Sequence, residues 1–132
     1  MIVLDTHTWI WFIDNPSLIP KRSKQLIEKS QAEKQIHISS ISVWEIYTLE
    51  GKGRLNFKIE AVEWVRRCER LGIFNFVPID NDIVKAACNL PGNFHRDPAD
   101  RFIVGLGRFL DAPVITKDEK IRRYPHIKAI WD

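Results

Sequence analysis

Hydrophobic positions along the chain follow two alternating patterns. Short runs rich in β-branched or aromatic residues are typical of buried strands, and they occur at residues 2–4, 36–38, 74–79, 114–115 and 127–131. Apolar residues recur at helical spacing between these runs, at residues 23–34, 42–49, 59–71, 82–90 and 99–110. Strands that alternate with helices favour a short, mostly parallel sheet that is covered by helices on both faces. We therefore predict an α/β fold.

The last long helix of this pattern contains two glycines, Gly105 and Gly107. Each glycine weakens a helix by up to about 1 kcal/mol relative to alanine, so its presence needs a reason. We expect close packing against the sheet at both positions. Pro98 suits the first position of this helix, where the missing N–H costs nothing.

Length and composition predict one domain that spans residues 1–132. The chain is 45% hydrophobic, which is enough for one core, and 132 residues are too few for two typical domains. No run approaches the roughly 18 apolar residues that a membrane span requires. Asp5 interrupts the apolar start before a signal peptide could form, so we expect a cytoplasmic protein without membrane contact. Cys68 and Cys88 lack metal-ligand spacing, which argues against a zinc site.

Charge and aromatic content indicate binding partners only weakly. The chain has 20 basic and 17 acidic residues, a net charge of +3. If several acids share one pocket, the remaining surface is more basic and attracts the phosphates of a nucleic acid. Two of the five tryptophans, Trp11 and Trp44, would suit a protein interface if they lie at the surface.

Two acidic residues follow predicted strands directly or closely. Asp5 comes after the first strand, and Asp118 comes shortly after residues 114–115. Because ligands of open parallel sheets bind beyond the carboxyl ends of the strands, both side chains are expected at one crevice. Glu45 and Asp100 lie in the first turns of helices that begin at this same edge.

Each of these acids alone has a structural explanation as a helix cap or as a charge that favours a helix N-terminus. Several carboxylates in one crevice repel one another unless a cation neutralises them. A cluster of oxygen ligands, without suitably spaced cysteine or histidine, favours Mg²⁺ or Mn²⁺ over zinc. Such an ion promotes hydrolysis of phosphodiesters.

Four segments of the chain resemble, in order, the acidic motifs of PIN-domain ribonucleases, most closely those of VapC-type toxins from bacterial toxin-antitoxin pairs. The segments are Asp-Thr-His at 5–7, Ser-Ser-Ile-Ser-Val-Trp-Glu at 39–45, Asp-Pro-Ala-Asp-Arg at 97–101 and Thr-Lys-Asp at 116–118. The resemblance covers nearly the whole chain. It implies one acidic pocket that binds Mg²⁺ or Mn²⁺ through the carboxylates of Asp5, Glu45, Asp100 and Asp118.

The resemblance implies a metal-dependent endoribonuclease of a VapBC-like toxin-antitoxin pair. Asp5, Asp100 and Asp118 would hold the ion, and Glu45 would bind a second ion or orient the attacking water. Asp97, three residues before Asp100, is the alternative ligand. Because water and not the ribose 2′-hydroxyl attacks phosphorus, the products should carry 5′-phosphate and 3′-hydroxyl ends. Implied partners are RNA, a small VapB-like antitoxin and a second copy of the chain.

Further residues are expected in supporting positions. The hydroxyls of Thr6 and Thr116 are suited to hold a carboxylate by hydrogen bonds. The basic residues near Asp118 are suited to contact RNA phosphates, and they are Lys117, Arg122 and Arg123. Single histidines such as His7 and His95 are more often surface or hydrogen-bonded residues than ligands.

Three other readings compete with a nuclease. A receiver-type signalling module would use Asp80 as phosphoacceptor and Thr116 as the switch hydroxyl, but it requires an acidic pair where this chain has Asp-Thr-His. A haloacid-dehalogenase-like phosphatase would use Asp5 as nucleophile, but His7 stands where its second aspartate is required. A PIN-like protein that binds its partner without nuclease activity is the third.

Overall fold

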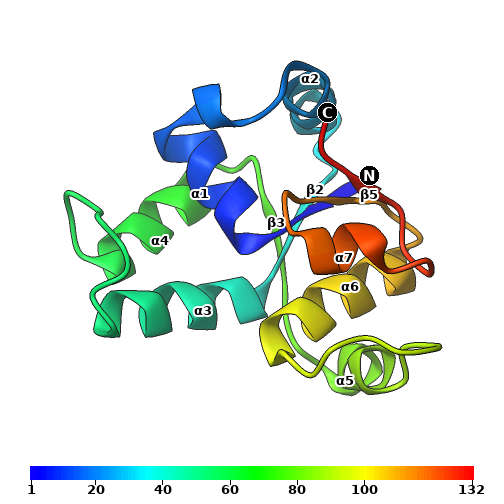
Figure 1. Cartoon of the computed structure of the whole chain (residues 1–132). Helices are drawn as coiled ribbons and strands as arrows, with labels where there is room; N and C mark the ends of the chain where they lie inside the picture. Colours follow the sequence, from blue (N-terminus) through cyan, green and yellow to red (C-terminus); the bar gives the residue numbers. More distant parts are fainter.

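The computed structural model describes residues 1–132 and contains one five-stranded sheet in the order β3-β2-β1-β4-β5 (Figure 1). The strands are β1 (Ile2–Leu4), β2 (Ile36–Ser39), β3 (Asn75–Val77), β4 (Val114–Ile115) and β5 (Ala129–Ile130). All four pairings are parallel, with β1 at the centre. This arrangement confirms the predicted α/β fold.

Seven α-helices and one short 3₁₀ helix surround the sheet. They are α1 (Thr6–Asp14), the 3₁₀ helix (Pro16–Leu18), α2 (Lys21–Ala32), α3 (Ser40–Gly51), α4 (Ala61–Arg70), α5 (Asn81–Cys88), α6 (Pro98–Leu110) and α7 (Glu119–Arg123). Helices α1, α2 and α4 pack against one face and α5 and α6 against the other, so both faces are covered, as predicted (Figure 1). None of the helices combines the length and apolar character that a membrane span requires.

Strand β1 lies between two hydrophobic clusters. Ile2 and Leu4 belong to the cluster under α1, α2 and α4, whereas Val3 belongs to the cluster under α5 and α6. All three side chains are almost completely buried because a central parallel strand has helices on both faces. Trp9 of α1 anchors the first cluster, with its ring centroid 5.0 Å from that of Trp64. This packing fixes the end of β1, where Asp5 begins the next helix.

The structure corrects the predicted element boundaries in several places. Strand β3 ends at Val77, not at residue 79, because Pro78 has no N–H to donate to a neighbouring strand. The last strand is only Ala129–Ile130 within the predicted residues 127–131. The hydrophobic pattern gave no boundaries for α1 or α7, because both are short and follow directly after a strand or its connecting turn.

The two glycines of α6 have different packing partners. A Cβ at Gly107 would lie 3.0 Å from Val114 Cγ2 of β4, so the expected packing against the sheet is confirmed there. A Cβ at Gly105 would instead lie 2.9 Å from the Cα of Ala87 in α5. The expectation for Gly105 was therefore wrong: it permits close approach of two helix backbones, not of a helix and the sheet.

Replacing Gly105 with alanine should destabilise the protein, although alanine favours helices. The added methyl group would meet the backbone of α5, and overpacking of this kind costs about 1–3 kcal/mol. Gly51→Ala is the matched control, because Gly51 also lies in a helix and a Cβ there meets no atom within 4 Å. Urea unfolding should show a loss for Gly105→Ala and an unchanged or higher stability for Gly51→Ala. Equal stability changes would show that α5 and α6 can separate at no cost.

Candidate active site

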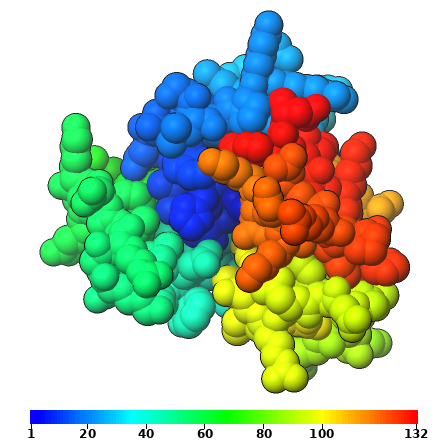
Figure 2. Space-filling view, viewed as in Figure 1, coloured from blue at the N-terminus to red at the C-terminus, as the bar shows by residue number.

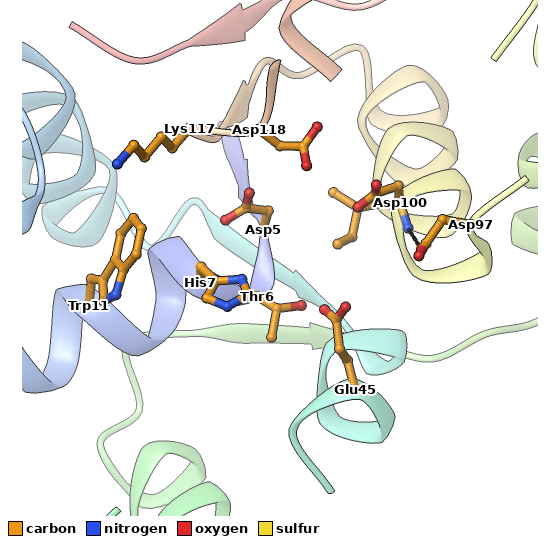
Figure 3. A pocket seen from close by; sticks show the side chains of 10 residues that line it. Asp5, Thr6, His7, Trp11, Glu45, Asp97, Asp100, Lys117 and Asp118 are labelled. Atoms are coloured by element: carbon orange, nitrogen blue, oxygen red, sulfur yellow. Dashed lines mark hydrogen bonds between the residues drawn. The ribbon is translucent and has the colours of Figure 1, made fainter. Parts of the chain in front are cut away.

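A cavity of about 440 Å³ opens beyond the carboxyl ends of β1 and β4. Figure 2 shows the N-terminal segment meeting α3, α6 and α7 around this region. The cavity is lined by Asp5, Thr6, His7, Trp11, Glu45, Asp97, Asp100, Ile103, Lys117 and Asp118 (Figure 3). The structure therefore brings together all four acids expected from the sequence, and Asp97 with them.

Three of the five acids are N-caps of helices that begin at this edge of the sheet. Asp5 caps α1, Asp97 caps α6 and Asp118 caps α7. Each uses Oδ1 to accept a hydrogen bond from the N–H three residues further on, at 2.8, 3.0 and 3.1 Å respectively. The helix-cap explanation therefore holds for these residues, but it accounts for only one of the two oxygens of each carboxylate.

Thr116 connects the two acids that follow β1 and β4. Its hydroxyl donates a hydrogen bond to Oδ2 of Asp5 and accepts one from the N–H of Asp118 at 2.9 Å. Asp5 is only 8% exposed, and burial raises its pKa, while the hydrogen bonds from Thr116 and Thr8 act in the opposite direction. Thr116 thus fixes the relative position of Asp5 and Asp118.

Glu45 approaches the cavity from α3, on the side opposite Asp118 (Figure 3). Burial raises the pKa of Glu45, and the negative charges of Asp97 and Asp5 add to this effect. Thr6 connects α1 to this helix, because its hydroxyl donates to Oγ of Ser42 at 2.8 Å. Hydrogen bonding by the Thr6 side chain also lowers the pKa of Glu45, against the effect of burial. Thr6 thus supports the acid on α3, and Thr116 supports Asp5.

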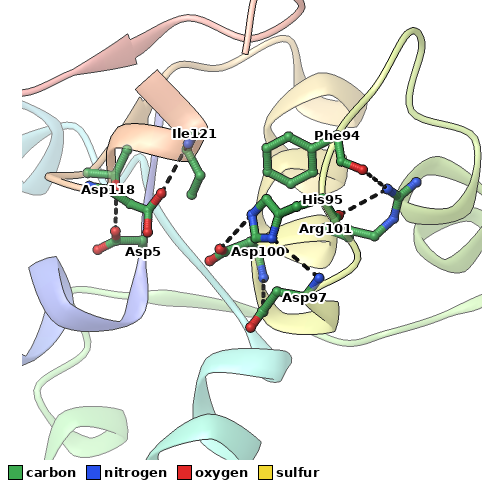
Figure 4. Close-up of polar contacts among 9 residues, drawn as sticks. Asp5, Phe94, His95, Asp97, Asp100, Arg101, Asp118 and Ile121 are labelled. Atoms are coloured by element: carbon green, nitrogen blue, oxygen red, sulfur yellow. Dashed lines mark hydrogen bonds and ion pairs between the residues drawn. The ribbon is translucent and has the colours of Figure 1, made fainter. Parts of the chain in front are cut away.

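Asp100 lies in the first turn of α6, and its Oδ2 is 3.0 Å from Nε2 of His95 (Figure 4). Nδ1 of His95 accepts a hydrogen bond from the N–H of Asp97, so the proton of a neutral imidazole belongs on Nε2, facing Asp100. Burial and then the charge of Asp118, followed by the other acids, raise the pKa of Asp100 to about 7. The carboxylates are therefore close enough to repel one another.

The sequence did not single out His95 as a partner of Asp100. The spacing of His95, Asp97 and Asp100 was a usable signal, because a histidine just before a capped helix can reach its first turn. Arg101 fixes the segment that carries His95 by donating to the carbonyls of Phe94 at 3.0 Å, His95 at 3.3 Å and Ala87 at 3.1 Å (Figure 4).

The three basic residues expected to contact RNA are not gathered in the cavity. Lys117 lines it, whereas Arg122 and Arg123 are exposed on α7 outside it. Arg123 forms an ion pair with Glu119 at 3.2 Å, and Arg122 borders a separate hollow with Arg22 and Lys128. Lys117 is thus the only lining residue with a permanent positive charge.

The cavity offers oxygen ligands that suit Mg²⁺ or Mn²⁺. One oxygen each of Asp100 and Asp118 has no protein partner. No three acidic, histidine or cysteine side chains are yet grouped as ligands of a single ion. Binding would therefore require side-chain rotation, and the charge of the bound cation would offset the repulsion that helps to raise the pKa of Asp100.

Comparison with known proteins gives a consistent result. The family model of the PIN domain matches residues 2–127. Ribonuclease VapC22 of Mycobacterium tuberculosis is 26% identical over 133 residues, and the match covers 98% of each chain. Among solved structures, VapBC2 from Rickettsia felis bound to a promoter DNA fragment superposes with a TM-score of 0.70 at 19% identity over 100% of both chains. DNA-bound VapBC from Salmonella typhimurium gives 0.69 at 21% identity over 98% and 96%.

Without divalent ions, the protein should lose stability as pH rises from about 4 to about 7. The folded state raises the pKa of Asp100 from 3.8 to about 7, so it binds a proton more tightly than the unfolded chain in this interval. Asp100→Asn removes the part of this dependence that comes from Asp100 and should be more stable than wild type at pH 8 by at least about 1 kcal/mol, since one pKa unit corresponds to about 1.4 kcal/mol. Urea unfolding of both proteins in chelator at pH 5 and pH 8 measures the pH dependence and the difference in stability.

Asp82→Asn is the matched control for this measurement, because Asp82 is an exposed acid in the first turn of α5. It should keep the pH dependence of the wild type. A wild-type pH dependence in Asp100→Asn as well would show that Asp100 does not experience the repulsion described above.

Proposed function

The chain belongs to the PIN domain family, and on that premise we propose that it is the ribonuclease toxin of a VapBC-like toxin-antitoxin pair. The observation that carries the proposal is the convergence of Asp5, Glu45, Asp100 and Asp118 on one cavity. The relative named a ribonuclease supports it, because the match extends over nearly the full length of both chains. We further propose that residues 1–132 act as a single domain in the cytoplasm.

We propose that Asp5, Asp100 and Asp118 hold a divalent ion, Mg²⁺ or Mn²⁺, through oxygen ligands. When bound, such an ion lowers the pKa of water and offsets the charge of the phosphodiester. Glu45 lies across the cavity with a raised pKa, which suits it to accept a proton from the attacking water or to bind a second ion. Water would attack phosphorus as the bond from phosphorus to the 3′ oxygen breaks, so the products would carry 5′-phosphate and 3′-hydroxyl ends.

The residues around the acids would keep them in position. Thr116 holds Asp5 and Asp118 together, and Nε2 of His95 faces Asp100. Asp100 and Asp118 each keep one oxygen without a protein partner. Both oxygens of Asp5 accept a hydrogen bond, from Thr8 and from Thr116, so Asp5 would bind an ion through the remaining lone pairs of those oxygens. Thr116 and His95 are thus positioning residues in this proposal.

Asp100 is favoured over Asp97 as the third metal ligand. The carboxylate of Asp97 accepts a hydrogen bond from the N–H of Asp100, so it is directed toward the N-terminus of α6. Burial and the charges of Asp118, Asp97, Glu45 and Asp5 raise the pKa of Asp100. A cation near Asp100 would therefore relieve this repulsion.

The proposed partners follow from the family and from charge. Two of the superposed structures are VapBC assemblies, and we propose a small VapB-like antitoxin as the partner of this chain, with a homodimer as its oligomeric state. RNA would be attracted by the net charge of +3 and contacted by Lys117, with Arg122 and Arg123 binding phosphates outside the cavity.

The competing readings fit the structure less well. Asp80, the phosphoacceptor of a receiver module, caps α5 and does not line the cavity. A phosphatase would need a second aspartate where His7 lies. Membership of the PIN family agrees with neither class. A PIN protein without nuclease activity would have the same fold, and a cleavage assay separates it from the proposed enzyme.

Cleavage of RNA should require a divalent ion and the capping acid Asp118. Asp118→Asn keeps a side chain that can cap α7 but removes a ligand charge, so the rate should fall about 100-fold or more. Asp80→Asn removes the charge of the corresponding cap of α5, outside the cavity, and should retain full activity. The assay incubates labelled RNA with Mg²⁺, Mn²⁺ or chelator and identifies the product ends. Undiminished cleavage in chelator, or cyclic-phosphate ends, would refute the mechanism.

Asp100→Asn should impair cleavage more than Asp97→Asn, because asparagine still caps α6 at position 97 whereas no substitute for the ligand charge exists at position 100. Saturating Mg²⁺ should also raise the melting temperature of the wild type more than that of Asp100→Asn. Rates and melting curves for both variants, with and without Mg²⁺, test the assignment. The reverse order of rates would make Asp97 the ligand.

A further inference from the structure

One side of the cavity is aromatic and basic instead of acidic. His7, Trp11 and Lys117 lie together on this side, across the cavity from Asp97 and Asp100 (Figure 3). The ring centroids of His7 and Trp11 are 5.8 Å apart, and Nζ of Lys117 is 5.9 Å from the Trp11 centroid. We call His7, Trp11 and Lys117 the aromatic wall.

The aromatic wall combines a fixed ring with accessible neighbours. Trp11 is half-buried and contacts Trp131 behind it, with ring centroids 5.8 Å apart, whereas His7 and Lys117 are exposed. A ring that packing already holds in place loses little entropy when a ligand stacks on it. Lys117 is also the only permanent cation of the lining, so this side attracts a phosphate that the five acids repel.

We propose that the aromatic wall is a base-stacking subsite for an unpaired nucleotide of RNA next to the cleaved bond. The base would contact Trp11 and His7, and Lys117 would contact the adjoining phosphate. This inference rests on the proposed ribonuclease function and assigns three residues of the cavity a role in positioning its substrate. Bases inside an A-form duplex stack on one another and offer no face to a protein ring, so the subsite selects single-stranded RNA.

The same chemistry predicts which property of the RNA is recognised. Every base has a π-face, so stacking on an aromatic ring tolerates sequence differences. The side chains of the aromatic wall carry no amide or carbonyl group to read the edge of a base; their polar groups are the His7 imidazole, the Trp11 indole N–H and the Lys117 ammonium. It should therefore distinguish unpaired from paired nucleotides much better than it distinguishes one base from another.

The test measures RNA binding by the full chain carrying Asp118→Asn in Mg²⁺, so that the probe stays intact. Probes are a fluorescein-labelled ten-nucleotide unstructured RNA, the same RNA annealed to its complement, and versions with one abasic nucleotide at successive positions. Trp11→Leu, which keeps apolar bulk, should weaken binding of the single strand about tenfold, as expected for the loss of one base–aromatic stack, and should lower the preference over duplex equally. Trp11→Phe, which keeps an aromatic ring, should retain most of the affinity for the single strand and most of the preference over duplex.

A double-mutant cycle links the ring to a base. One abasic position should weaken binding by the parent protein about tenfold and have little further effect in Trp11→Leu. Lys117→Met should weaken the binding of all probes and reduce the salt dependence of binding. Trp44→Leu is the matched control, because Trp44 is 53% exposed on α3 and does not line the cavity.

Several results would overturn the subsite. Equal losses in Trp11→Leu for single-stranded, duplex and abasic RNA would show that Trp11 acts only through the fold. Unchanged affinity in that variant would leave the aromatic wall as a surface for protein contact. If Trp11→Leu does not fold, the abasic series with the parent protein decides, since the absence of any sensitive position contradicts stacking. No RNA binding by the Asp118→Asn parent would instead refute the proposed function, and cleavage of the probe at the wild-type rate by this parent would refute the role given to Asp118.

Discussion

Repulsion among five carboxylates at one edge of the sheet is the constraint around which this structure is built. Three of them, Asp5, Asp97 and Asp118, are N-caps, so α1, α6 and α7 all begin at the cavity. The positive ends of these helix dipoles stabilise nearby anions and offset part of the repulsion. The offset is incomplete, because Asp100 still has a pKa raised to about 7. The remaining negative charge is what a divalent cation would neutralise.

The geometry that gathers the acids depends on burial at the centre of the sheet. β1 and β4 are buried on both faces, so the residues that follow them, Asp5 and Thr116, leave the sheet at fixed positions. Thr116 then connects Asp5 to Asp118, and Arg101 fixes the segment that brings His95 to Asp100. Hydrophobic packing therefore sets the positions of the charged groups, and local hydrogen bonds set their orientations.

The sequence predicted the sheet, five of the helices and the acidic cluster because each depends on local or periodic signals. Buried parallel strands are continuous apolar runs, and acids directly after them must lie at the ligand-binding edge. The contact between His95 and Asp100 and the close approach at Gly105 were not predictable in the same way. Both depend on how a connecting segment or a second helix folds back, and neither leaves a periodic pattern in the residues involved.

Helix α1 contributes residues to both the acidic side and the aromatic side of the cavity. Its cap, Asp5, is on the acidic side, and its residues His7 and Trp11 are four positions apart, so they project from one face of the helix toward the aromatic side. The opposite face carries Trp9, which is fully buried against the sheet. Because one short helix holds both groups against the core, the spacing between the acids and the aromatic wall is fixed by backbone geometry. A nucleotide that stacks on Trp11 would therefore place its phosphodiester at a defined distance from Asp5.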